Sequence, residues 1–223
     1  SINHETGTAE VSRAYNNHFE YFDNLVIPDV LYVDGISYII TSIGKKAFQD
    51  CWYLSSVIIS DNVLYIDDEA FKCCSNLSNI KLGKNIRSIG KKAFSGCGHL
   101  QSIVIPNGVT KIGANAFDWC DLYSVRLPES ILEIGDNAFI ANPNLVEINF
   151  PKDIKKMGER IVDPMSFVFN YYKDVVYIND YVLGYKEGGS NTTEVQIKDG
   201  TKYICSGAFE LQKELTSVSI PNG

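Results

Sequence analysis

A repeat of about 23 residues runs through most of this 223-residue chain. The hexapeptide Ile-Gly-Lys-Lys-Ala-Phe occurs at Ile43–Phe48 and again, 46 residues later, at Ile89–Phe94. Its first position recurs at steps of 22 or 23 residues and then, after a gap of 47, once more: Ile43, Ile66, Ile89, Ile112, Ile134, Met157 and Ile204. A period of this length is typical of a solenoid, in which each unit stacks only on its neighbours. The repeat therefore favours one long stack over a duplicated active site.

Residues 100–120 show what one unit predicts. Ile103 and Ile105 alternate with Val104, which indicates a short strand with both isoleucines inward. The turn residues 106–108 end this strand, because proline has no amide to donate to a ladder. The next position after the repeated isoleucine is usually Gly, as at Gly113, or Asp. We interpret it as the N-cap of a short helical turn.

An Ala-Phe pair lies on that predicted turn in six units. Its phenylalanines are Phe48, Phe71, Phe94, Phe117, Phe139 and Phe209. One unit cannot bury its own apolar side, whereas coils stacked about 4.8 Å apart would merge these rows into one core. We therefore expect the phenylalanines to be buried next to one another.

Composition excludes several classes of protein. The net charge of −7 and the pI near 5.0 argue against a nucleic-acid partner, which requires a basic surface. No run of about 18 apolar residues predicts a membrane span, so we expect no membrane insertion. No signal peptide precedes Ser1, and the sequence stops within a repeat at Gly223, so we expect a piece of a longer protein.

The pattern L-x-x-V/I-x-I/L-P-x-x-V/I-x-x-I-G-x-x-A-F-x-x-C resembles the BspA-type (treponemal class) leucine-rich repeat over about residues 38–160 and 197–223. The resemblance implies a right-handed solenoid with a parallel sheet on one face. It also implies a surface protein of bacteria or some protozoa that adheres to host proteins or other cells. No catalytic residues define that family, so we expect no enzyme and no cofactor. The expected fold class is an α/β repeat solenoid with short helical turns and an N-terminal β-hairpin cap.

The chain is divided here into four parts of one solenoid domain. Residues 1–40 are expected to cap its first coil, in part through a hairpin whose turn is Asp34-Gly35, since Asp-Gly between apolar runs favours a type I′ turn. Segments 9–15 and 24–28 would complete this cover. Residues 41–157 carry regular repeats, and residues 201–223 carry one truncated repeat.

Residues 158–200 break the repeat and are rich in aromatic side chains. We interpret them as about two irregular coils with a hairpin insertion, whose strands meet at Asn179-Asp180. The aromatic residues could fill a core that lacks the usual repeat residues. Alternatively, Tyr171 and Tyr172 could belong to a recognition surface, since tyrosine is enriched at interfaces.

Cysteine occupies the same repeat position in four units. These residues are Cys51, Cys74, Cys97 and Cys120. We expect buried free thiols, which behave as small apolar groups, although a disulfide between neighbouring coils stays open. No CxxC motif or histidine pair indicates a metal site, so none is expected. His99 is expected in a solvated loop, and no nucleophile, zinc or nucleotide motif is present.

Outward strand positions are the candidate binding face. In each unit one residue stands between the two inward apolar residues and should face solvent. We select Ile58, Lys81, Val104, Arg126 and Asn149, together with Tyr171 and Tyr172. Variable side chains on a constant scaffold are typical of a protein-binding surface, although an ordinary solvated face is the alternative.

The leading functional prediction is a non-enzymatic interaction module, secreted or on the cell surface, that binds host extracellular or microbial surface proteins. A glycan ligand is also compatible with it. The first alternative is a structural spacer that presents another domain. The second is a carbohydrate-active β-helix enzyme, which would need paired carboxylates on adjacent coils. Asp67 and Asp68 lie within one turn instead of stacking across coils, which disfavours the enzyme.

Overall fold

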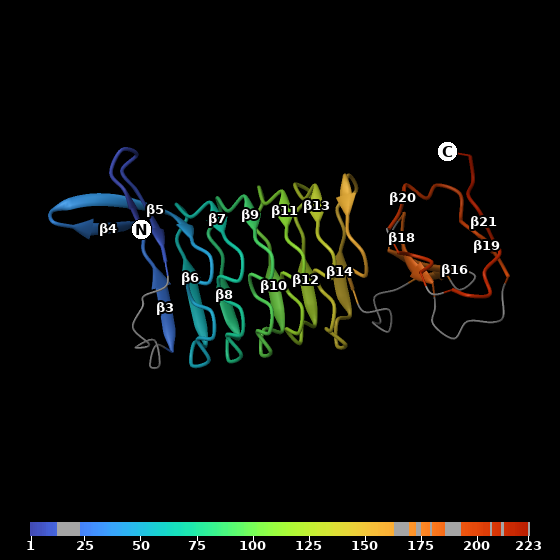
Figure 1. The fold of residues 1–223 in the computed structure, drawn as a ribbon, viewed down its shortest axis with the longest axis horizontal. Coiled ribbons are helices and arrows are strands. Elements are labelled where there is room, and N and C mark those ends of the chain that lie inside the picture. Colours follow the sequence, from blue (N-terminus) through green and yellow to red (C-terminus); the bar gives the residue numbers. More distant parts are fainter. Residues whose placement is uncertain are drawn as a thin grey trace.

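The computed structural model describes residues 1–12, 23–162, 170–172, 175–178, 180–185, 193–205, 207–210 and 212–222. The described chain forms a right-handed solenoid of stacked coils (Figure 1). Each regular coil contributes one strand to each of two parallel arrays, and a run of turns forms its remaining side. The repeated stack expected from the 23-residue period is therefore confirmed.

The first array carries the strands of the candidate binding face. It comprises two three-stranded parallel sheets in the order β3-β6-β8 and β10-β12-β14. Their bounds are Asn24–Ile27 (β3), Ser56–Ile59 (β6), Asn79–Lys81 (β8), Ser102–Val104 (β10), Ser124–Arg126 (β12) and Glu147–Asn149 (β14). Inward residues alternate with outward ones along each strand, as the apolar alternation in the sequence predicts.

The second array is one nine-stranded sheet, which holds the repeated isoleucines. Its main path is β1-β2-β5-β7-β9-β11-β13-β15, and β4 pairs with β5 at the side. The bounds are Ile2–Asn3 (β1), Thr8–Val11 (β2), Val30–Val33 (β4), Ile36–Ile43 (β5), Tyr65–Ile66 (β7), Ser88–Ile89 (β9), Lys111–Ile112 (β11), Glu133–Ile134 (β13) and Lys156–Met157 (β15). Ile43, Ile66 and Ile89 pair in register along it.

The expected short helical turns are absent from the described part of the chain, so that part of the fold prediction is wrong. The turn after each repeated isoleucine has a residue with positive φ three positions on, for example Lys92 (56°) and Asn115 (57°). Such a residue breaks a right-handed helix. Amides in the turn instead bond to the next coil, as when Phe94 N donates to Ala116 O at 2.8 Å. The segment is a ladder of turns that links coils.

The glycine after the repeated isoleucine was expected to cap a helix, and that interpretation is wrong too. A Cβ atom at Gly113 would lie 2.5 Å from Lys91 N and 2.6 Å from Gly90 C in the preceding coil. At Gly135 it would lie 2.4 Å from Ala114 N. Glycine therefore permits close backbone approach between neighbouring coils.

The phenylalanine row forms the centre of the core, as expected. Phe71, Phe94 and Phe117 have no exposed surface, and Phe48 is only 5% exposed. Consecutive rings stack with centroids 5.2 to 5.4 Å apart and interplanar angles of 3° to 11°. One ladder of aromatic rings therefore runs continuously from Phe48 to Phe139.

The N-terminal hairpin forms as the sequence predicts. Strand β4 pairs antiparallel with β5, and both residues of its two-residue turn have positive φ, 52° at Asp34 and 78° at Gly35. The hairpin does not itself cover the first coil, because it extends away from the stack (Figure 1) and Tyr32 near its tip is 75% exposed. The strands that pair with the first regular coil are β2 and β3. Residues 13–15 of the expected cover lie outside the described residues.

Strands beyond residue 162 form two further sheets. The bounds are Asn170–Tyr172 (β16), Val175–Ile178 (β17), Tyr181–Tyr185 (β18), Glu194–Gln196 (β19), Tyr203–Ile204 (β20) and Ser217–Ser219 (β21). Strands β17 and β18 pair antiparallel as the predicted hairpin, although Asn179 lies outside the described residues. The parallel pairs β18-β20 and β19-β21 resume the two-strand pattern of a coil.

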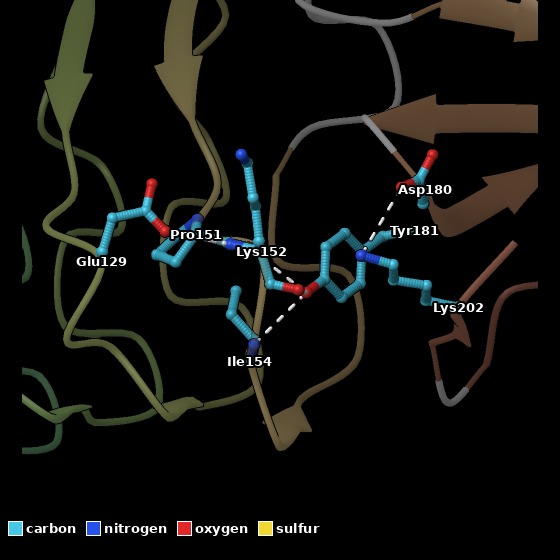
Figure 2. A network of polar contacts seen from close by, with 7 residues as sticks. All are labelled: Glu129, Pro151, Lys152, Ile154, Asp180, Tyr181 and Lys202. Carbon is cyan, nitrogen blue, oxygen red and sulfur yellow. Dashed lines mark hydrogen bonds and ion pairs between the residues drawn. The ribbon is translucent and has the colours of Figure 1, made fainter. Parts of the chain in front are cut away.

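Tyr181 joins this C-terminal part to the regular coils (Figure 2). Its hydroxyl donates to Lys152 O at 2.8 Å and accepts from Ile154 N at 3.2 Å. Burial raises the pKa of the Tyr181 phenol, so the hydroxyl stays protonated and able to donate. Cys205 Sγ adds a contact of 3.1 Å to Met157 Sδ. The two parts therefore share one core at this junction.

Replacing Tyr181 by phenylalanine should lower the free energy of unfolding by about 1–3 kcal/mol. The substitution keeps the ring but leaves the Lys152 carbonyl and the Ile154 amide without their partner. Chemical denaturation would measure the loss, with the exposed Tyr123→Phe as a matched control expected to change little. A Tyr181→Phe protein as stable as the control would show that the hydroxyl does not hold the junction.

Candidate binding face

The five predicted strand positions form one row on the solvent side of the first array. Ile58 pairs with Lys81 across β6 and β8, and Val104, Arg126 and Asn149 pair in turn across β10, β12 and β14. All five side chains are exposed. Their inward neighbours are buried at Val57, Ile59, Ile103 and Val125. Buried ladders thus fix the spacing of the exposed row, as the sequence predicts.

Apolar and cationic side chains share this row. Val104 is 66% exposed and Ile58 is 46% exposed, which is a high exposure for aliphatic side chains. Lys81 and Arg126 supply positive charge on a protein whose net charge is −7. The Lys84 ammonium, which is 2.8 Å from Asp61, holds the pKa of the Asp61 carboxyl below its usual value, and Lys81 adds to this effect. The face can therefore meet an apolar surface that carries acidic groups.

Asn149 has a structural task as well as an exposed position. Its side-chain amide donates to Leu127 O at 2.7 Å and accepts from Leu127 N at 2.9 Å. These bonds satisfy the backbone where β12 ends, so Asn149 extends the pairing of β14 beyond its last residue. Its amide is therefore already used within the protein.

Val26 is a sixth member of the row that sequence reasoning missed. It pairs in register with Ile58 across β3 and β6 and is 61% exposed. Asn-Leu-Val-Ile-Pro at 24–28 matches Ser-Ile-Val-Ile-Pro at 102–106, with Val26 in the place of Val104. That match was the available signal. Together Val26, Ile58, Lys81, Val104, Arg126 and Asn149 are called the outer row below.

Tyr171 and Tyr172 are not brought to the outer row. Both belong to β16, whose sheet has the order β16-β17-β18-β20 and is separate from the first array. The side chains of these two residues lie outside the described part of the structure. Their role in recognition therefore stays a prediction.

The cysteine row is structural. Cys74, Cys97 and Cys120 are fully buried, and all six cysteines are free thiols. Each buried thiol donates to the carbonyl of a phenylalanine in the preceding coil, at 3.1 to 3.3 Å. Asn142 takes the same place one coil later and donates to Phe117 O at 2.9 Å. The expectation of buried free thiols holds for these three residues.

Burial also makes these thiols poor nucleophiles. It raises the pKa of Cys97 and Cys120 well above the usual value and that of Cys205 to about 12. Among the described residues, no group of three or more potential metal ligands comes together. His99 is exposed, as expected, and its Nδ1 lies 2.7 Å from Ser75 O.

The stacked coils with parallel strands define a leucine-rich-repeat solenoid. The family model for the BspA type leucine rich repeat region matches residues 41–165 and 176–223, in six copies. This match covers most of the chain, so the chain belongs to the BspA-type leucine-rich repeat family. No curated protein sequence matches the chain at a significant level.

Several solved structures are similar to this chain. A leucine-rich repeat protein from Bacteroides ovatus is 26% identical, with a TM-score of 0.63 over 100% of this chain. The chain spans 63% of the length of that protein. The T. pallidum leucine-rich repeat protein is 27% identical, with a TM-score of 0.53 over 71% of this chain and 82% of its own. A leucine rich cell surface protein from Faecalibacterium prausnitzii is 21% identical, with a TM-score of 0.57 over 98% and 73%, and it supports the fold alone.

Proposed function

We propose that this chain is a non-enzymatic protein-binding module that acts through the outer row. The observation that carries the proposal is the register of that row: exposed side chains of differing chemistry project at fixed spacing from buried ladders. Exposed variable positions on a rigid scaffold commonly serve recognition. Membership of a leucine-rich-repeat family is consistent with an interaction role.

The partner that fits this face is a protein with an apolar patch flanked by carboxylates. Val104 lies between Lys81 and Arg126 in the sequence of coils, so an apolar contact would have a cation on each side. Interfaces commonly combine an apolar centre with arginine at hot spots. Cations on a protein of net charge −7 would also steer an acidic partner to this face.

We further propose that the module works at a cell surface, in adhesion. The similar protein from Faecalibacterium prausnitzii is described as a cell surface protein, which supports this location by analogy. None of the described segments forms an apolar helix of membrane-spanning length. Attachment to a cell would accordingly not use a helix in this described region.

A triple variant tests the binding face. Lys81→Glu, Val104→Ser and Arg126→Glu together reverse its charges and remove its most exposed aliphatic side chain, without touching the core. The wild-type protein would be screened by surface plasmon resonance against purified extracellular-matrix and bacterial surface proteins. We expect at least about tenfold weaker binding of the triple variant to the partner that is found.

The matched control changes the second array. Tyr65→Ser with Lys156→Glu alters exposed outward residues of β7 and β15 and should leave affinity unchanged. Equal affinity of the triple variant and wild type would exclude the outer row as the binding face. Binding to no member of the panel would favour the spacer alternative.

A further inference from the structure

The N-terminal hairpin has one unpaired edge of defined geometry. Ile40 N donates to Asp29 O at 3.0 Å, and the register continues through Leu31 opposite Tyr38. Bonded and non-bonded pairs alternate in an antiparallel ladder, so Leu31 faces β5 with its backbone groups. The backbone N–H and C=O groups of Val30 and Tyr32 therefore point outward. No hydrogen bond within the described part of the chain uses them.

Protections that natural edge strands commonly carry are missing here. Strand β4 reads Val-Leu-Tyr-Val, with no lysine, proline or bulge within it. Tyr32 is 75% exposed on one face of the hairpin, and Leu31 is 40% exposed on the other. Figure 1 shows the hairpin projecting beyond the stacked coils, which leaves this edge accessible.

The base of the hairpin is firmly held, which pre-organises the edge. Tyr38 is 2% exposed, and its hydroxyl lies 2.8 Å from His4 Nδ1. Ile39 N donates to Gly7 O at 3.0 Å on the side away from β4. A strand that is already extended and fixed loses little conformational freedom when another strand is added to it.

Charge selects the kind of strand that fits. Exposed aspartates flank β4 at both ends, Asp29 before it and Asp34 after it. Antiparallel pairing of β4 with a second copy would place Asp29 opposite Asp34 twice, and like charges directly opposite are unfavourable. Lys84 interacts with Asp29, but its ammonium pairs with Asp61 at 2.8 Å. The edge therefore favours a partner with basic ends.

We propose that the outer edge of β4 binds an extended peptide segment that has alternating apolar residues and a basic residue at each end, and that it adds this segment as a further strand. Backbone bonds to Val30 and Tyr32 would supply the pairing, as in other cases of strand addition. Asp29 and Asp34 lie five residues apart, so the basic residues of the partner would also be five apart. This proposal does not depend on the outer row.

The probe is the blocked peptide Lys-Val-Thr-Val-Thr-Lys, added to the whole chain and followed by two-dimensional NMR. We expect shifts concentrated at residues 29–34 and the facing part of β5. The peptide Glu-Val-Thr-Val-Thr-Glu should bind at least about tenfold more weakly. N-methylation of alternate peptide residues should abolish binding in one of the two possible phases only, because only one edge of the added strand meets β4.

Two proline variants isolate the edge. Tyr32→Pro removes an outward amide, which an edge strand tolerates, so the fold should survive while peptide binding falls at least about tenfold. Ser37→Pro is the matched control: Ser37 lies opposite Tyr32, but its amide points to the other side of the hairpin, so binding should persist. Tyr32→Thr keeps the edge amide and should bind within about threefold of wild type.

Three results would overturn the proposal. One is equal binding by both N-methylated peptides, and another is peptide shifts that fall away from the hairpin. The third is concentration-dependent self-association that Tyr32→Pro abolishes, which would make a second copy the occupant of the edge. Melting temperatures of the variants would confirm that each protein is folded.

Discussion

Replacing Phe94 by alanine should lower the free energy of unfolding by about 3–5 kcal/mol. Phe94 has no exposed surface, and its ring stacks between Phe71 at 5.2 Å and Phe117 at 5.3 Å. Truncation would leave a cavity in the middle of the aromatic ladder, with neighbouring coils on both sides that cannot close it without breaking their own hydrogen bonds. Chemical denaturation followed by circular dichroism would measure the loss.

Trp119→Ala is the matched control for this prediction. It also removes a large aromatic ring from a turn of the same coil region, but Trp119 is 69% exposed. We expect it to change the unfolding free energy by less than about 1 kcal/mol. Comparable losses from Phe94→Ala and Trp119→Ala would contradict a core built on the phenylalanine row.

Replacing Gly113 by alanine should be nearly as damaging, with a loss of about 3 kcal/mol. The added methyl group would overlap Lys91 N at 2.5 Å and Gly90 C at 2.6 Å. Those atoms are backbone, and they belong to a coil that is itself bonded on both sides, so relief requires neighbouring coils to separate. Thermal and chemical unfolding would both report the change.

Gly98→Ala provides the matched control, because a Cβ atom there meets nothing within 4 Å and its φ is not positive. This substitution should be neutral or stabilise by about 0.4–1 kcal/mol, since alanine restricts the unfolded chain. If Gly113→Ala were as mild as Gly98→Ala, the glycine row would not be needed for close contact between coils.

The core could be predicted from the sequence because its signal is repeated. A single Ala-Phe pair has little meaning, but six pairs at one period require a common environment. The structure places Phe71, Phe94 and Phe117 in one stacked row. The Asp34-Gly35 turn was also predictable, because its positive φ angles depend on local residues alone.

The turns could not be predicted from the same letters. Spacing of apolar residues three or four apart around Phe94 fits either a helical turn or a sequence of tight turns. The choice depends on where the amides bond, and Phe94 N bonds to Ala116 in the next coil. That partner is 22 residues away, so no local pattern shows it. Gly113 was misread for the same reason, because the atoms that exclude a side chain belong to another coil.

The binding face was predictable in its exposure but not in its extent. Alternation within each strand placed Val104 and Arg126 outward correctly. It could not show that Asn149 uses its amide on Leu127, because that contact crosses coils. Val26 was assigned to a cover for the first coil, although its strand in fact begins the face.

Amide hydrogen exchange tests the central claim most directly, namely that the coils are welded into one core through the phenylalanine turns. Phe71 N, Phe94 N and Phe117 N donate to carbonyls of the next coil at 2.7 to 2.8 Å. We predict that these three amides exchange only through global unfolding, with one shared free energy equal to that from denaturation. Exchange of any of them by local opening, coil by coil or at the rate of an exposed turn, would contradict the account.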